Sequence, residues 1–126
     1  MAQSQKPEIS LTALLEDLDG DRELLETILE DFSREYGALR GVLRDALDNR
    51  DLSLASRTAH SMKSGLGMLG WHEGVPLADS IHRLCDAEDL DAARDVWERF
   101  DPLLGEMLSQ VESTLLDLQS FSGGVS

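Results

Sequence analysis

The stretch AHSMKSGLGMLG, residues 59–70, decides how this chain folds. It completes an apolar stripe whose members recur at alternating steps of three and four residues: Leu52, Ala55, Ala59, Met62, Leu66 and Leu69. That spacing predicts an amphipathic helix from about Leu52 to Leu69, and Gly70 is a typical C-terminal stop. At about 100° per residue, His60 points roughly 130° away from the centre of the stripe, so we expect its side chain to face water.

The residues around His60 form an unusual surface for an acidic protein. Lys63, Ser64 and Gly67 follow His60 within an arc of about 100° on the helix. Arg57 lies three residues before His60 and adds a second positive charge. Helix solubility is the alternative role for both cations. The imidazole therefore has positive charge on both sides and almost no bulk on its C-terminal side, a surface that another protein's active site can reach.

Working outward, the same periodicity predicts helices on both sides of this stretch. We expect them over the following ranges: Ser10, as N-cap, to about Leu18; about Arg22 to Asp48; about Val75 to Ala87; and Glu88-Asp89 to about Leu118. Long helices joined by short connections predict an all-α protein, an antiparallel up-down-up-down four-helix bundle with a short extra N-terminal helix across one end.

The boundaries of the domain follow from composition. We expect a flexible N-terminus over residues 1–8, one helical bundle over residues 9–119 and a flexible, Gly/Ser-rich tail over residues 120–126. Pro102 lies inside the last helical pattern, and we expect it to kink or split that helix near Asp101.

Length and charge limit the function classes. The chain has 126 residues and a formal net charge of −14, which suits one domain and argues against nucleic acid or an anionic membrane as the main partner. Its single cysteine, Cys85, fits a reducing compartment and a buried position. The start is polar and no apolar run approaches the roughly 20 residues of a membrane helix, so we expect a cytoplasmic protein.

The run Thr58–Lys63, followed by small residues and by Gly70, resembles the histidine-containing phosphotransfer (HPt) domain family. The family pattern is Ala-His-x-apolar-Lys-Gly, then small residues, then Leu-Gly. The resemblance covers about Leu11 to Leu118 and includes further segments: Leu29-Glu30-Asp31-Phe32, the break at Asn49-Arg50-Asp51 and the opening Leu90-x-x-Ala93.

The resemblance implies a phosphoryl carrier that is not an enzyme with turnover of its own. In the family, a histidine accepts a phosphoryl group from a receiver-domain aspartate or from a sensor histidine kinase and passes it to another receiver domain. His60 would be the phospho-acceptor, Lys63 would stabilise the phosphate, and Gly67 and Gly70 would keep the approach clear. The residues agree with this, because imidazole is a competent nucleophile near neutral pH and the carrier needs no cofactor. We expect a monomer.

Two positions depart from the family pattern. Ser64 stands where the family has glycine, and Gly65 follows it; the Ser64 hydroxyl is a candidate to bind the phosphoryl group. Many members also place a polar residue of the next helix against the reactive ring to orient it. By position, His82 or Asp79 is the candidate here, and the sequence leaves open which of them, if either, contacts His60.

Met68 and Trp71 are expected to add adaptable apolar area to the docking surface formed with Gly67 and Gly70. His82 and Cys85 lie three residues apart, but two further ligands at a fixed spacing are missing, so we expect no metal site.

Two other functions remain open. The bundle could act as an adaptor that binds or sequesters a receiver domain without accepting phosphate. Alternatively, the chain could be a phospho-accepting module of a larger sensor kinase. The sequence names neither the cognate kinase nor the receiver.

Overall fold

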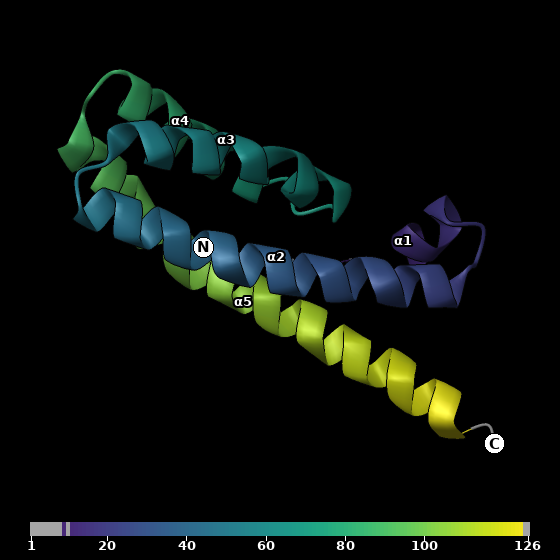
Figure 1. The fold of residues 1–126 in the computed structure, drawn as a ribbon. Helices are drawn as coiled ribbons and strands as arrows, with labels where there is room; N and C mark the ends of the chain where they lie inside the picture. The colour runs from purple at the N-terminus through teal and green to yellow at the C-terminus, as the bar shows by residue number, and fades with distance from the viewer. Residues whose placement is uncertain (1–8, 10, 125–126) are drawn as a thin grey trace, which may run out of the picture.

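The computed structural model describes residues 9 and 11–124 and forms a bundle of helices (Figure 1). Within this part of the chain there are five, α1 (Leu11–Asp17), α2 (Arg22–Asp48), α3 (Leu52–Met68), α4 (Gly74–Asp86) and α5 (Leu90–Gly124). Each of α3 to α5 runs opposite to the one before it, and α5 returns to pack against α2. The predicted all-α, up-down-up-down bundle with an extra N-terminal helix is confirmed.

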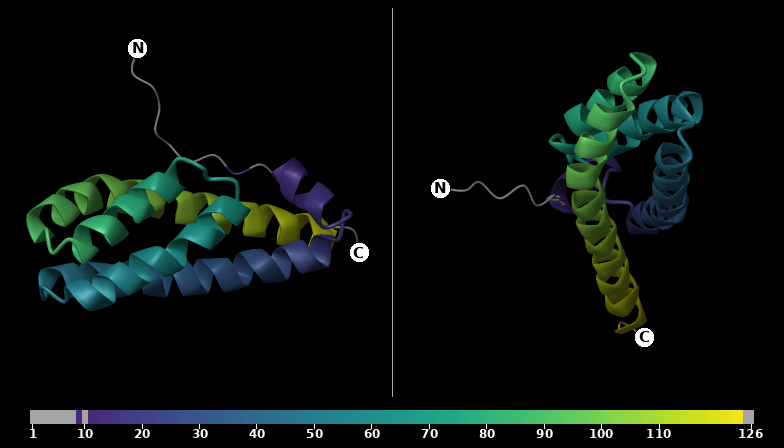
Figure 2. Two further views of the ribbon diagram at one scale, coloured as in Figure 1. Left: turned by 90° about the horizontal axis from the view of Figure 1, so that it is seen from above. Right: turned by 90° about the vertical axis from the view of Figure 1, so that its left-hand side faces the viewer.

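The four bundle helices differ in length, and this sets the overall shape. The longer α2 and α5 form a pair, and the shorter α3 and α4 pack together over one part of it (Figure 2). The short helix α1 lies beside the start of α2 and lines a hollow together with the end of α3. His60, on α3, therefore belongs to the shorter pair of helices.

Aspartate side chains begin three of the helices. The carboxylates of Asp21, Asp51 and Asp89 each accept a hydrogen bond from the backbone N–H three residues further on, at 3.0–3.1 Å. Such N-caps satisfy donors that the first helical turn leaves unpaired. Much of the acidic charge at the helix starts therefore has a local structural role.

The expected apolar stripes form one core. From α3 it receives Ala55, Ala59, Met62 and Leu66, and from α5 it receives Phe100, Leu104, Met107 and Val111. Cys85 is buried among them, as the sequence predicts. Burial of this continuous surface, at roughly 25 cal/mol per Å² of apolar area, is the main contribution that holds the helices together.

Of the two effects expected of Pro102, the split is wrong, because α5 continues through it as one helix, and the kink stays a prediction. The Pro102 side chain is exposed, so the carbonyl that loses its N–H partner one turn earlier lies on a side open to water. Phe100 and Leu104, on either side of the proline, are fully buried. Their packing holds both halves of α5 against the same core.

The ends of the chain also differ from the expectation. Helix α5 runs to Gly124, past the predicted end near Leu118, so residues 120–124 of the expected loose tail are helical. Propensity is a weak prior, and extending an existing helix adds one hydrogen bond per residue. Residues 1–8, the Ser10 cap and residues 125–126 lie outside the described residues. Among the helices that are described, none combines the length and the apolar character needed to cross a membrane.

Candidate functional site

His60 lies exposed on the outer side of α3, opposite the buried stripe, as the helical periodicity predicts. Helix α4 brings His82 against it, with ring centroids 4.9 Å apart and an interplanar angle of 44°. Of the two candidates for the residue that contacts the His60 ring, the geometry therefore favours His82.

The ring of His82 is held from behind by Ser56 and Asp86. The Ser56 hydroxyl donates to Asp86 Oδ1 at 2.5 Å, so its proton is already used. His82 Nδ1 must then be the donor toward Ser56, whose Oγ lies at 2.9 Å and whose carbonyl oxygen lies at 3.2 Å. His82 Nε2 lies 3.6 Å from Asp86 Oδ2. The ring that contacts His60 thus has its tautomer and orientation set by this network.

Asp79, the other candidate for orienting the ring of His60, forms an ion pair with Lys63 instead. The Lys63 ammonium donates to Asp79 Oδ1 at 2.8 Å, and Arg83 Nε donates to Asp79 Oδ2 at 2.7 Å. The hydrogen bond from Lys63, assisted by that from Arg83, lowers the pKa of Asp79 against the opposing effect of desolvation. Asp79 is therefore a carboxylate shared by two cations, one on each of the helices α3 and α4.

On the other side of α3, Tyr36 of α2 sets the packing. It is buried, stacks on Phe32 with centroids 3.9 Å apart, and donates its hydroxyl proton to the Met62 carbonyl at 2.9 Å. A Cβ atom on Gly65 would collide with this hydroxyl. Burial, with a contribution from Glu35, raises the pKa of Tyr36 to about 12.

That contact gives a physical reason for the shifted glycine of the motif. Position 65 must lack a side chain because Tyr36 fills the space, whereas Ser64 points to an exposed surface where a small polar side chain is tolerated. The sequence shows both residues but not the tyrosine that separates their roles.

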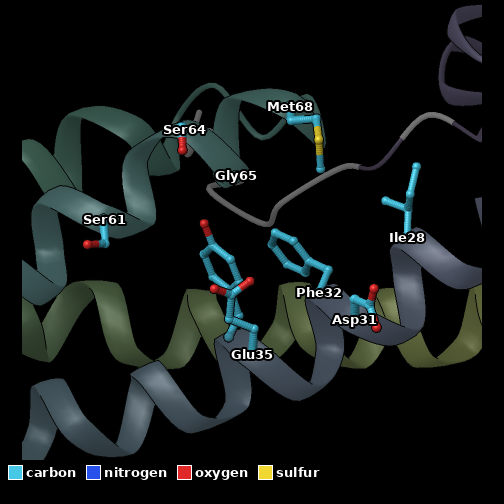
Figure 3. Close-up of a pocket in the computed structure, with 9 residues that line it drawn as sticks. Ile28, Asp31, Phe32, Glu35, Ser61, Ser64, Gly65 and Met68 are labelled. Atoms are coloured by element: carbon cyan, nitrogen blue, oxygen red, sulfur yellow. The ribbon is translucent and has the colours of Figure 1, made fainter.

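A groove runs between α2 and α3 next to this packing (Figure 3). Ser61, Ser64 and Met68 line it from α3, and Phe32 with the carboxylates of Asp31 and Glu35 lines it from α2. Met68 is 53% exposed. We call this surface the α2–α3 groove.

Gly67 and Gly70 also lie where an incoming protein can reach them. A Cβ on Gly67 would meet only Val75 Cγ2, at an ordinary 3.8 Å, so the position is open. Gly70 has φ +87°, a left-handed conformation that favours glycine, and a Cβ there would meet no atom within 4 Å. The expected low bulk beyond His60 is therefore present.

Trp71 does not belong to that surface, and the prediction that it does is wrong. Its side chain is fully buried and stacks on Phe100 with centroids 5.8 Å apart. The backbone N–H of Trp71 donates to the Leu66 carbonyl and that of Gly70 to the Gly67 carbonyl, both at 3.0 Å, which is the Schellman arrangement. In that motif the residue after the left-handed glycine folds back onto the helix, and this carries the indole into the core.

Arg57, the second cation expected near His60, is exposed. Among the ion pairs of the described residues, none includes Arg57, in contrast to Lys63. Within the same part of the chain, no cluster of three or more His, Cys, Asp or Glu side chains is arranged to hold a metal ion.

Three site residues were not recognised in the sequence: Ser56, Asp86 and Arg83. Each lies four residues from another site residue: Ser56 from His60, Asp86 from His82, and Arg83 from Asp79. This one-turn spacing is the signal that points to them, because residues four apart share a helix face.

Comparison with known proteins gives one finding. The protein-family model of the Hpt domain matches residues 27–114, well over half of the chain, and this range contains all the site residues described above. No curated protein and no solved structure gave a match.

Proposed function

This chain belongs to the Hpt domain family, and we propose that it carries a phosphoryl group on His60 in a two-component phosphorelay. Hpt domains take part in histidine phosphotransfer and are in general phosphocarriers rather than enzymes. In the proposal, the group arrives from a sensor histidine kinase or a receiver-domain aspartate and leaves to the aspartate of another receiver domain. The observation that carries it is an exposed imidazole on α3 whose ring contacts the fixed ring of His82.

The chemistry asks little of the carrier. A lone pair on a ring nitrogen of His60 attacks the phosphorus of the aspartyl phosphate, the N–P bond forms, the P–O bond to the aspartate breaks, and the carboxylate leaves. Positioning and charge neutralisation supply most of the catalysis in such transfers. Mg²⁺ would come with the receiver domain. This chain's part is to present the ring and to surround the phosphoryl group with donors.

Lys63, Arg57 and Ser64 are the proposed donors to that group. They lie within one turn of His60, and the first two bring positive charge to a chain whose net charge is −14. Opposite charges near a docking site favour association and orient the partner. Lys63 differs from Arg57 in that it already has a carboxylate partner, Asp79.

For the docking surface we propose Gly67, Met68 and Gly70, together with the α2–α3 groove. The two glycines leave the approach open, and Met68 contributes a flexible apolar side chain at the edge of the groove. The proposal retains the expectations of a cytoplasmic location and of a monomer. The molar mass of the purified protein, measured by light scattering, checks that it is a monomer.

The test is phosphorylation of the purified chain by two donors, a panel of phosphorylated receiver domains of the host and the small molecule phosphoramidate. We expect an acid-labile, base-stable phosphate on the wild type and on His72→Gln, which removes another exposed histidine. We expect none on His60→Gln, with little change in thermal stability, because exposed substitutions usually cost within about 0.5 kcal/mol.

Phosphate at the wild-type level on His60→Gln would contradict the assignment of His60. A receiver domain that binds the chain while neither donor phosphorylates it would favour the second candidate, an adaptor that sequesters the receiver. Unfolding of His60→Gln would show instead that His60 has a structural role.

A further inference from the structure

Lys63, Asp79 and Arg83 form a charged cluster across the α3–α4 contact, one turn from His60. Asp79 uses one carboxylate oxygen for each cation, Oδ1 for the Lys63 ammonium and Oδ2 for the Arg83 guanidinium. The side chains of Lys63 and Asp79 are 23% and 28% exposed, whereas that of Arg83 is 77% exposed. Lys63, the cation on the same helix as His60, is thus the less exposed of the two.

The two cations are bound in different ways, and this matters when a new anion arrives. Lysine has a flexible stem and three N–H donors, so its ammonium can turn to another acceptor by rotation of the side chain. Arg83 lies four residues after Asp79 on the same helix, a spacing that keeps the pair together wherever Lys63 goes. If Lys63 leaves, Asp79 therefore retains a cation.

A phosphoryl group on His60 would place an anion of up to two negative charges beside this cluster. It would compete with Asp79 for the ammonium of Lys63. The ion pair between Asp79 and Lys63 therefore reduces the stabilisation that Lys63 can give to the phosphoryl group. Arg83 weakens that ion pair, because it shares the carboxylate of Asp79.

We propose that Asp79 and Arg83 are positioning residues that set the lifetime of the phosphohistidine through Lys63, which moves from Asp79 to the phosphoryl group when His60 is phosphorylated. The inference rests on the proposed function of His60. In this proposal, helix α4 both orients the ring of His60 and sets how long the phosphoryl group stays on it.

The experiment loads the full chain with phosphoramidate, removes the donor and measures the half-life of the phosphohistidine. We expect Asp79→Asn to lengthen it roughly two- to fivefold, the range that a partly exposed ion pair supports, because Lys63 is released. We expect Arg83→Gln to shorten it by a similar factor, because Asp79 then has Lys63 as its single partner. In a Lys63→Ala background, Asp79→Asn should have no effect.

A second readout separates positioning from mere structure. In ³¹P NMR, the phosphoryl group changes from dianion to monoanion as the pH falls. This change should occur at a lower pH in Asp79→Asn than in the wild type, because a free ammonium favours the dianion. Asp45→Asn is the matched control, since it removes one exposed carboxylate paired with an arginine on α2. It should leave both the half-life and the ³¹P titration unchanged.

The outcomes are distinguishable. If phosphoramidate fails to modify His60 in the wild type, the proposed function fails. If it modifies His60 but Asp79→Asn leaves the half-life unchanged or shortens it, carriage of the group stands and the role of the cluster is overturned. A longer half-life of Asp79→Asn that persists in the Lys63→Ala background also overturns it, because Asp79 would then act on the phosphoryl group directly.

Discussion

Helix α3 packs on α2 and on α4 through the shared apolar core, and on the two sides of His60 these contacts add different interactions. Toward α2, the buried Tyr36 fits against Gly65, where no side chain has room. Toward α4, partly exposed polar side chains such as His82 and Asp79 make hydrogen bonds and ion pairs. The difference teaches that one side can anchor the helix by shape while the other keeps charges free to respond to a ligand. The predictions below test this division, in order of decreasing effect.

The largest effect is expected from Gly67→Phe, on the side of α3 that contacts α4. A ring at this open position would stand in the path of a docking receiver domain and lower the rate of transfer from the receiver about 100-fold or more. Phosphoramidate should still modify His60, because a small donor needs far less room. Both reactions and the circular dichroism spectrum are measured on the same variant. Retained transfer from the receiver would exclude this surface from docking, and an unfolded spectrum would mean that Gly67 is needed for packing.

Next comes Gly65→Leu, on the side that faces α2. Its side chain would collide with the Tyr36 hydroxyl and break the bond to the Met62 carbonyl, so we expect a loss of about 3 kcal/mol in the free energy of unfolding. Urea unfolding measures it. The same change in a Tyr36→Ala background should cost less, because the space is then empty. An unaltered stability of Gly65→Leu would show that shape does not anchor this side.

Tyr36 also makes this side sensitive to alkali. Its pKa is raised to about 12 in the fold, so the neutral phenol is the form that folding favours. Stability should be complete below pH 10, the ordinary pKa of tyrosine, and should decline as the pH rises toward 12, by about 2 kcal/mol. Because Tyr36 is the single tyrosine of the chain, its ultraviolet titration is unambiguous. Ionisation of the folded protein near pH 10 would contradict a buried phenol.

The smallest effect is expected from Gly67→Ala, and its sign is opposite. The new Cβ would meet only Val75 at 3.8 Å, and alanine is the better helix former, so stability should rise by up to about 1 kcal/mol. Thermal unfolding compares it with Gly65→Ala, which should destabilise because its Cβ strikes Tyr36. If both alanines had the same effect, the two sides of α3 would not differ in packing.

The sequence by itself determined the helices, their buried faces and the exposure of His60. These depend on local periodicity, because the spacing of apolar residues determines which face of a helix is buried, independently of which helix packs against it. The stripe that ends at Leu69 and the stop at Gly70 therefore follow from the pattern along the chain alone, as does the resemblance that the Hpt family match confirms.

The tertiary structure alone decided which residues meet across helices. Trp71 follows a predicted stop yet lies in the core. Gly65 is required because Tyr36 of another helix, α2, fills the space beside it, and Asp79 pairs with Lys63 rather than with the ring of His60. Likewise, Pro102 stays within one helix because the side chains around it pack on a common core. Such pairings depend on the relative height and rotation of two helices, and these are set by the packing of the whole core rather than by the pattern along either helix.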